Sequence, residues 1–285
     1  MQGERPFIRD EIERLCAKPF SEGNRVRLIW KSNELFEAIF ESISNATKVI
    51  CLEFYIFRND ETGIELARLL KKKASEGVYV SVIYDHFGSF GTPLKFWREL
   101  KAAGIGVRAS RPFKWMSPLR YAHRDHKKLI IIDGMKAFTG GLNIANEYSG
   151  YFRKKRKKAW RDTGILIEGP IATELLKEFD KSWALWEKRR FKHEPIRKAL
   201  EVSAPAYTDG SLPVIPIFAS SFKGRKRLRT LLYYSIKQSK ESVNLTTAYF
   251  TPSRKMIRSL SDAVKRGVRV SILLPSESDV SAAIY

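Results

Sequence analysis

Residues His126–Asn143 read HKKLIIIDGMKAFTGGLN, and this stretch decides how the fold is interpreted. A histidine and a lysine two residues apart precede an apolar run, which ends at Asp133-Gly134 and is followed by a glycine pair. Four consecutive aliphatic residues indicate a strand that is buried on both faces, and Asp-Gly is typical of a tight hairpin turn. The sequence therefore predicts a central hairpin that carries His126 and Lys128 at its start.

The residue types of this stretch favour chemistry on a phosphodiester. Side chains two positions apart in an extended segment project to the same side, so His126 and Lys128 are predicted to share a site while Lys127 points away. A neutral imidazole is a competent nucleophile toward phosphorus. Lys128 and the amide of Asn143, helped by the backbone at Gly141, would then bind the non-bridging oxygens as their charge grows. This chemistry calls for no metal and no cofactor.

Two acidic residues have less specific positions. We assign Asp133 to the catalytic group, although the first residue of an Asp-Gly turn also serves turn geometry alone. A histidine that attacks through one ring nitrogen needs an acceptor at the other, and Asp162 is the candidate. An ordinary strand-edge carboxylate is the alternative for Asp162. His86 follows a predicted strand, and a structural role is favoured for it.

The spacing HxK(x)4D(x)6GGxN resembles the HKD motif of the phospholipase D superfamily, and within that superfamily the chain looks like the bacterial cardiolipin synthases. Further similar stretches are Leu52–Phe57 and Trp160–Thr163. The resemblance implies a mixed α/β sheet flanked by helices. It also implies a phosphatidyltransferase, which joins two phosphatidylglycerol molecules through a phosphohistidine and releases glycerol. A second motif, whose histidine acts as general acid, is expected at the same site.

The pattern along the chain is that of an α/β protein, because short apolar runs alternate with amphipathic stretches. Strands are predicted at 26–30, 48–57, 78–84 and 105–107, and helices at 33–45, 61–76 and 93–103. A weak internal repeat aligns residues 43–57 with 236–250, and Gly77–Ile83 with Gly267–Leu273. Strand–helix units of separate origin share such composition, so the repeat has this second explanation.

These patterns predict a first phospholipase D-like unit over 1–190, a linker over 191–212 and the start of a second unit over 213–285. The second unit shows no second HxK motif. We therefore interpret the second unit as incomplete and the chain as inactive by itself. The alternative is a homodimer that pairs two copies of His126.

Composition indicates an anionic partner. The chain has 52 Lys and Arg against 31 Asp and Glu, a net charge of +21, which suits nucleic acid or an anionic membrane. The aromatic and basic segment Ser110–Tyr121 and the run Arg153–Lys158 favour the membrane, although a solvated charge run is the alternative. Anionic phospholipid is the predicted partner. A phosphodiesterase or nuclease that acts on nucleic acid as a homodimer is the second choice.

Two cysteines without metal-ligand spacing and the lack of an apolar run of about 18 residues predict a cytoplasmic protein. We expect it to lie peripherally on the inner face of the cell membrane.

Overall fold

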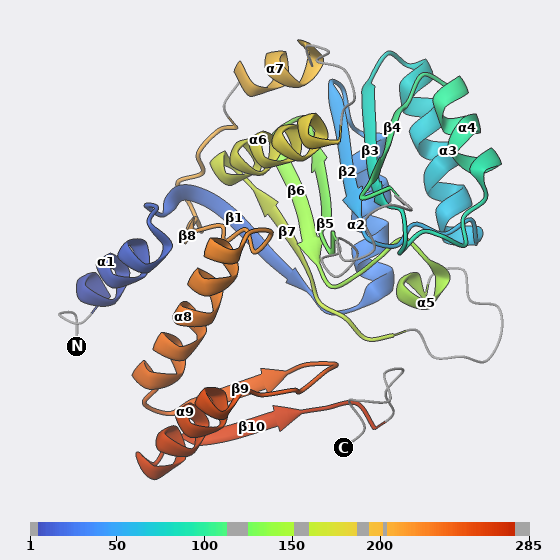
Figure 1. The fold of residues 1–285 in the computed structure, drawn as a ribbon. Helices are drawn as coiled ribbons and strands as arrows, with labels where there is room; N and C mark the ends of the chain where they lie inside the picture. Colours follow the sequence, from blue (N-terminus) through green and yellow to red (C-terminus); the bar gives the residue numbers. More distant parts are fainter. Residues whose placement is uncertain (1–4, 113–124, 151–159, 187–193, 202–203, 277–285) are drawn as a thin grey trace. The chain divides into compact units, whose positions relative to one another are not determined.

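The computed structural model describes residues 5–112, 125–150, 160–186, 194–201 and 204–276 (Figure 1). The chain forms two compact units, and each is described by itself. One unit is Ser21–Val214. The other combines Met1–Phe20 with Ile215–Tyr285. The predicted segments 113–121 and Arg153–Lys158 lie outside the described residues.

The Ser21–Val214 unit is built on an eight-stranded sheet in the order β4-β3-β2-β5-β6-β7-β1-β8. The strands are β1 (Ser21–Ile29), β2 (Val49–Phe54), β3 (Tyr79–Asp85), β4 (Gly106–Ser110), β5 (Lys128–Ile132), β6 (Lys136–Gly140), β7 (Gly164–Glu168) and β8 (Leu212–Val214). β2, β3 and β4 run parallel, whereas β5 is antiparallel to both β2 and β6. The sheet is thus mixed, as predicted.

One face of this sheet forms the larger hydrophobic core with α2 (Ser32–Ser44), α3 (Glu61–Ser75), α4 (Leu94–Ala102) and the short α5 (Asn146–Ser149). The sheet contributes residues of one strand parity to this core, among them Leu52 and Ile130. Lys128, two residues before Ile130, therefore lies on the same face. The predicted helices and strands of this region are present, although β1 begins five residues before its predicted start, β2 ends three residues before its predicted end, and β4 ends three residues after its predicted end.

The opposite face of the sheet is covered by α6 (Pro170–Leu185), which packs across β1, β2, β5, β6 and β7. Leu176 and Phe179 of α6 are fully buried. Glu53 and Leu129 pair between β2 and β5 and have the strand parity of this face. Two helical layers thus enclose the centre of the sheet, and the two sides of β5 meet different surroundings (Figure 1).

The hairpin that joins β5 to β6 has the predicted turn. Asp133 and Gly134 adopt φ angles of +54° and +69°, and the amide of Met135 donates to the carbonyl of Ile132. Positive φ at both positions is what Asp-Gly favours in a hairpin. Every residue of β5 is buried, so the expected burial on both faces is confirmed.

The second unit contains α1 (Arg5–Cys16), α8 (Phe222–Gln238), β9 (Ser242–Thr246), α9 (Arg254–Lys265) and β10 (Arg269–Leu273). β9 and β10 pair in parallel around the crossover helix α9, as β2 and β3 do around α3. Each crossover helix is followed by a glycine with positive φ, Gly77 at +87° and Gly267 at +85°. The predicted repeat therefore corresponds to two strand–helix–strand units of the same topology.

The units of the structure differ from the predicted boundaries in two places. Residues 1–20 group with the second unit, because α1 packs against α8. The predicted linker 191–212 contains α7 (Glu194–Glu201), which packs on α6 and β2 and buries Ile196 and Ala199. Charged and proline residues around α7 conceal these two apolar contacts in the sequence.

Among the helices that the structure describes, none is long and apolar enough to cross a membrane.

The side chain of Asp133 connects the hairpin between β5 and β6 to the start of β2. Its carboxylate accepts the amide of Thr47 at 2.9 Å, the hydroxyl of Thr47 at 2.9 Å, and the amides of Lys48 and Val49 at 2.8 and 2.9 Å. The four donors satisfy both carboxylate oxygens. Asp133 therefore holds the sheet together at the end of β5 that is opposite to His126.

We predict that Asp133→Ala lowers the free energy of unfolding by about 3 kcal/mol, because charge-assisted hydrogen bonds are lost and alanine tolerates the left-handed conformation poorly. Urea unfolding followed by circular dichroism measures the change. The exposed Asp209, replaced in the same way, is the matched control and should leave the midpoint nearly unchanged. Equal stability of the two variants would contradict the structural role of Asp133.

Candidate functional site

His126 and Lys128 lie together at the start of β5. Lys128 is the first residue of the strand and pairs with Phe54 of β2. Its ammonium nitrogen lies 3.1 Å from Nδ1 of His126 and donates to the His126 carbonyl oxygen at 3.0 Å. The structure thus confirms that the two side chains share one side of the strand. Among the described residues, Nε2 of His126 has no hydrogen-bond partner.

Lys127 points to the opposite side, as predicted. Its ammonium lies 3.0 Å from Oε1 of Glu53 and donates to Oγ of Ser182 in α6 at 2.6 Å. Burial and the neighbouring carboxyl of Asp125 raise the pKa of Glu53, while Lys127 acts against this rise. The Lys127 carbonyl also accepts the amide of Tyr55 at 3.1 Å. Lys127 is thereby fixed by its side chain on the face away from the site and by its backbone next to β2.

Asp85, the last residue of β3, also holds the segment before β5 and is fully buried. One carboxylate oxygen accepts the amides of Phe87 and Gly88, each at 3.0 Å. The other accepts the amide of Asp125 at 3.2 Å. Asp85 therefore fixes the backbone immediately before His126, and its negative charge lies near the imidazole.

The surroundings of His126 favour its neutral form. Burial lowers the pKa of His126, the charge of Lys128 lowers it further, and the charges of Asp85 and Asp125 act in the opposite direction. The neutral ring has the lone pair that a nucleophile needs. The ring of Tyr55 packs against the imidazole with a centroid distance of 4.5 Å, and the Lys128 ammonium lies 5.5 Å from the same ring.

Lys128 is itself strongly affected by burial. Only 7% of the residue is exposed, and burial lowers its pKa to about 8, while the carboxylates of Asp162 and Asp125 act to raise it. A buried ammonium that makes few hydrogen bonds gains much from an anionic oxygen. The position of Lys128 is thus well suited to receive a phosphate group.

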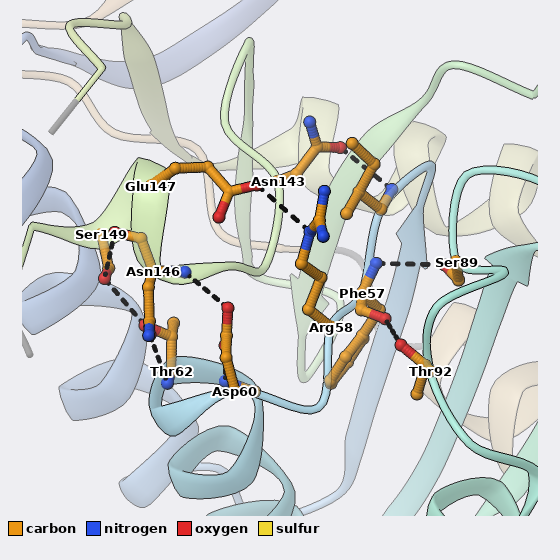
Figure 2. Close-up of polar contacts among 12 residues, drawn as sticks. Phe57, Arg58, Asp60, Thr62, Ser89, Thr92, Asn143, Asn146, Glu147 and Ser149 are labelled. Carbon is orange, nitrogen blue, oxygen red and sulfur yellow. Dashed lines mark hydrogen bonds and ion pairs between the residues drawn. The ribbon is translucent and has the colours of Figure 1, made fainter.

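Asn143 and Lys128 line the same cavity of about 20 Å³, together with Gly140. Asn143 is buried, and its amide oxygen accepts the amide of Ile56 at 3.1 Å. Figure 2 shows this bond and places the amide nitrogen on the other side of the group. The structure therefore brings Asn143 close to Lys128 and fixes the orientation of its amide.

Gly141 and Asp162 are in direct contact. A Cβ atom at Gly141 would lie 2.0 Å from Oδ1 of Asp162, so no larger residue fits at this position. The amide of Gly141 donates to the carbonyl of Thr163 at 3.2 Å, which continues the pairing of β6 with β7. This N–H group is consequently not directed at a substrate. In place of the predicted phosphate contact, the structure gives Gly141 the role of making room for a carboxylate.

Asp162 lies on the Lys128 side of the site. Burial raises the pKa of Asp162, whereas a hydrogen bond from the Thr163 amide, at 2.7 Å, and the charge of Lys128 act to lower it. The structure shows no hydrogen bond between Asp162 and His126. The orienting role that the sequence suggests for Asp162 therefore stays a prediction, and its observed neighbours are Lys128 and Gly141.

Asp133 does not belong to this group. Its carboxylate is bound to Thr47–Val49 beyond the far end of β5, and Asp133 lies five residues, or roughly 17 Å of strand, from Lys128. The structure thus gives Asp133 the turn role that was the alternative to catalysis. Its place in the motif follows from the length of the strand, since the turn must come where β5 ends.

Sequence reasoning missed Asp85 and Glu53. Asp85 ends a buried parallel strand and precedes a glycine-containing loop, and such strand ends gather functional groups in α/β sheets. That signal was present beside His86. Glu53 is a charged residue inside an apolar strand, which also marks a special position, but its partner Lys127 is identified only by the pairing of β2 with β5.

Comparison with known proteins identifies the family. A family described as "Cardiolipin synthase, PLD-like domain" matches residues 39–183 and 232–284. The two matches begin four residues before Ile43 and Ile236, the starting points of the predicted repeat. The chain belongs to this phospholipase D-like family.

Among curated proteins, cardiolipin synthase A of Pseudomonas fluorescens (strain SBW25) is 32% identical over 270 residues, which are 94% of this chain and 54% of that protein. Cardiolipin synthase A of Pseudomonas putida (strain GB-1) is 30% identical over 269 residues, with the same coverage. The chain spans about half the length of these relatives. Among solved structures, phosphatidylserine synthase of Haemophilus influenzae Rd KW20 has a TM-score of 0.66 at 17% identity, covering 96% of this chain and 70% of that chain. This likeness concerns the fold.

We predict that Lys128→Met raises the pKa of His126, because the nearby positive charge is removed. Asp85→Asn should lower the pKa of His126, because a negative charge is removed. Titration of the imidazole signals by NMR in folded protein measures both shifts, with His126→Asn used to assign the signal. Shifts of the same sign in the two variants would contradict the arrangement of charges around His126.

Proposed function

We propose that this chain provides a nucleophilic half-site for phosphatidyl transfer of the cardiolipin synthase type. The observation that supports the proposal is the pairing of the exposed His126, whose pKa is lowered by its surroundings, with the buried ammonium of Lys128. The family and the similarity to cardiolipin synthase A make phosphatidylglycerol the substrate of choice. Two such molecules would be joined, and glycerol would be released.

In the first step, a phosphate that enters the site attracts the ammonium of Lys128 away from Nδ1 of His126. The ring proton then resides on Nδ1, with Asp162 as the proposed acceptor, and Nε2 carries the lone pair. Nε2 forms a bond to phosphorus, and the bond between phosphorus and the glycerol oxygen breaks. The glycerol oxygen takes up a proton, for which the family resemblance implies a second histidine.

In the second step, a hydroxyl of another phosphatidylglycerol attacks the phosphatidyl group on His126. The new phosphorus–oxygen bond forms as the phosphorus–nitrogen bond breaks, and the hydroxyl proton passes to a base. Lys128 stabilises the negative charge on the non-bridging oxygens in both steps, and the amide nitrogen of Asn143, on the side away from the bond to Ile56, donates to the same oxygens. The step needs no metal ion.

The net charge of +21 supports an anionic membrane as the place of this reaction. We propose that the chain acts on the inner leaflet as a peripheral protein. The same charge also attracts nucleic acid, so the experiment must include a nucleic-acid substrate.

We predict that the protein, incubated with vesicles that contain labelled phosphatidylglycerol, acquires an acid-labile label on His126. His126→Asn should abolish the label, and His86→Asn is the matched histidine control and should retain it. Denaturing electrophoresis followed by peptide mass spectrometry detects the adduct, and thin-layer chromatography detects cardiolipin. Chelation of divalent cations should change neither result.

The dependence of the rate on protein concentration tests the source of the second motif. A specific activity that rises with concentration indicates that two copies combine. Cleavage of single-stranded DNA without any lipid product would overturn the phosphatidyl-transfer proposal in favour of a nuclease.

A further inference from the structure

The loop between β3 and α4 exposes large apolar side chains beside the candidate site. Phe90 is 81% exposed and Leu94 is 67% exposed, and Phe87 is 58% exposed. The loop begins at Asp85, the residue that also holds the backbone next to His126. We term residues 90–94 the apolar tip; the start of this loop is bound by the same buried carboxylate that binds the amide of Asp125.

Hydrogen bonds to Phe57, in the segment that follows β2, fix the backbone of this loop. The hydroxyl of Ser89 accepts the amide of Phe57 at 3.0 Å, and the hydroxyl of Thr92 donates to the carbonyl of Phe57 (Figure 2). Ser89 and Thr92 are almost fully buried. A Cβ atom at Gly88 would lie 2.3 Å from the carbonyl oxygen of Tyr55, so the loop also packs tightly at this point.

Because the backbone of the loop is fixed, its apolar side chains stay exposed to solvent. A loop that is bound at Ser89 and Thr92 cannot turn Phe90 inward without breaking buried hydrogen bonds. The exposure of Phe90 is therefore built into the structure. Apolar side chains that are held out in this way mark a contact surface.

The charges around the apolar tip indicate what covers it. Leu94, Arg98 and Lys101 follow one another at helical spacing on the exposed side of α4, and Lys95 is also exposed. Glu99 is the one acidic residue of α4. An apolar projection with a basic surround suits an anionic bilayer, where the apolar groups enter the headgroup boundary and the cations bind phosphates. A second copy of the same surface would instead bring like charges together.

We propose that the apolar tip inserts into an anionic lipid bilayer and so presents headgroup phosphates to His126. This inference rests on the proposed function and specifies how that site reaches its substrate. Phe90 and Leu94 provide the inserted groups, and Lys95, Arg98 and Lys101 provide the electrostatic contact. Asp85 binds both the start of the loop that carries the tip and the backbone before the reactive histidine.

The experiment measures binding to vesicles of equal parts phosphatidylglycerol and phosphatidylcholine by flotation. It uses His126→Asn as the background, so that no covalent product forms and binding is independent of the reaction. Phe90→Ser with Leu94→Ser should weaken binding at least about tenfold, because two apolar side chains are no longer buried in lipid. Phe222→Ser with Leu228→Ser, at exposed positions of α8, is the matched control and should bind as the background does.

A direct readout places an environment-sensitive fluorophore on Phe90→Cys. The native cysteines, Cys16 and Cys51, are buried and should not react in folded protein. Emission from position 90 should shift to the blue with the mixed vesicles, whereas emission from Phe222→Cys should not. Arg98→Gln with Lys101→Gln should reduce the preference for vesicles with phosphatidylglycerol over pure phosphatidylcholine.

Several outcomes would overturn the inference. One is that the protein binds vesicles while the fluorophore at position 90 still reports an aqueous environment. Another is that the α8 control variant loses as much binding as the variant of the apolar tip. A blue shift that depends on protein concentration without lipid would assign the tip to a second copy, and a shift with single-stranded DNA alone would assign it to nucleic acid. Insertion without a phosphatidyl label on His126 in the unsubstituted protein would keep the lipid surface and overturn the proposed function alone.

Discussion

The structure depends on the burial of β5 between two helical layers. Because the strand is apolar on both faces and is paired on both edges, its register cannot slip by one residue without exchanging every side chain between the layers. This constraint sends Lys127 to Glu53 and Ser182 on one side and Lys128 to His126 on the other. The alternation of side chains along β5 therefore brings Lys128 to His126, and the packing of the core holds the two residues in this position.

Burial also explains the unusual electrostatics. The side chains of two consecutive lysines lie on opposite sides of a buried sheet. Removing each ammonium from water costs free energy, and the groups that compensate this cost differ between the two sides. Lys127 is compensated by the Glu53 carboxyl, whereas Lys128 has an imidazole and a backbone oxygen close by, with Asp162 contributing through its charge. The less compensated cation is the one on the side of His126. An anion that binds there supplies what the protein alone leaves incomplete.

Much of the first unit could be predicted from the sequence, because the hairpin, the turn and the shared side of His126 and Lys128 are local properties of 18 residues. The roles of Asp133 and Gly141 could not, since each depends on a neighbouring strand: Asp133 binds the start of β2, and the Gly141 amide binds the residue before β7. Asp85 is remote from His126 in the chain and reaches it only through the strand order. The burial of α7 was hidden because Ile196 and Ala199 are isolated among charged residues.

Asp85 has a mechanical consequence. Its two oxygens hold two backbone segments that are 38 residues apart, at Phe87 in the exposed loop and at Asp125 next to the imidazole. Because one carboxylate binds both segments, loss of Asp85 would release the start of the exposed loop and the backbone before His126 together.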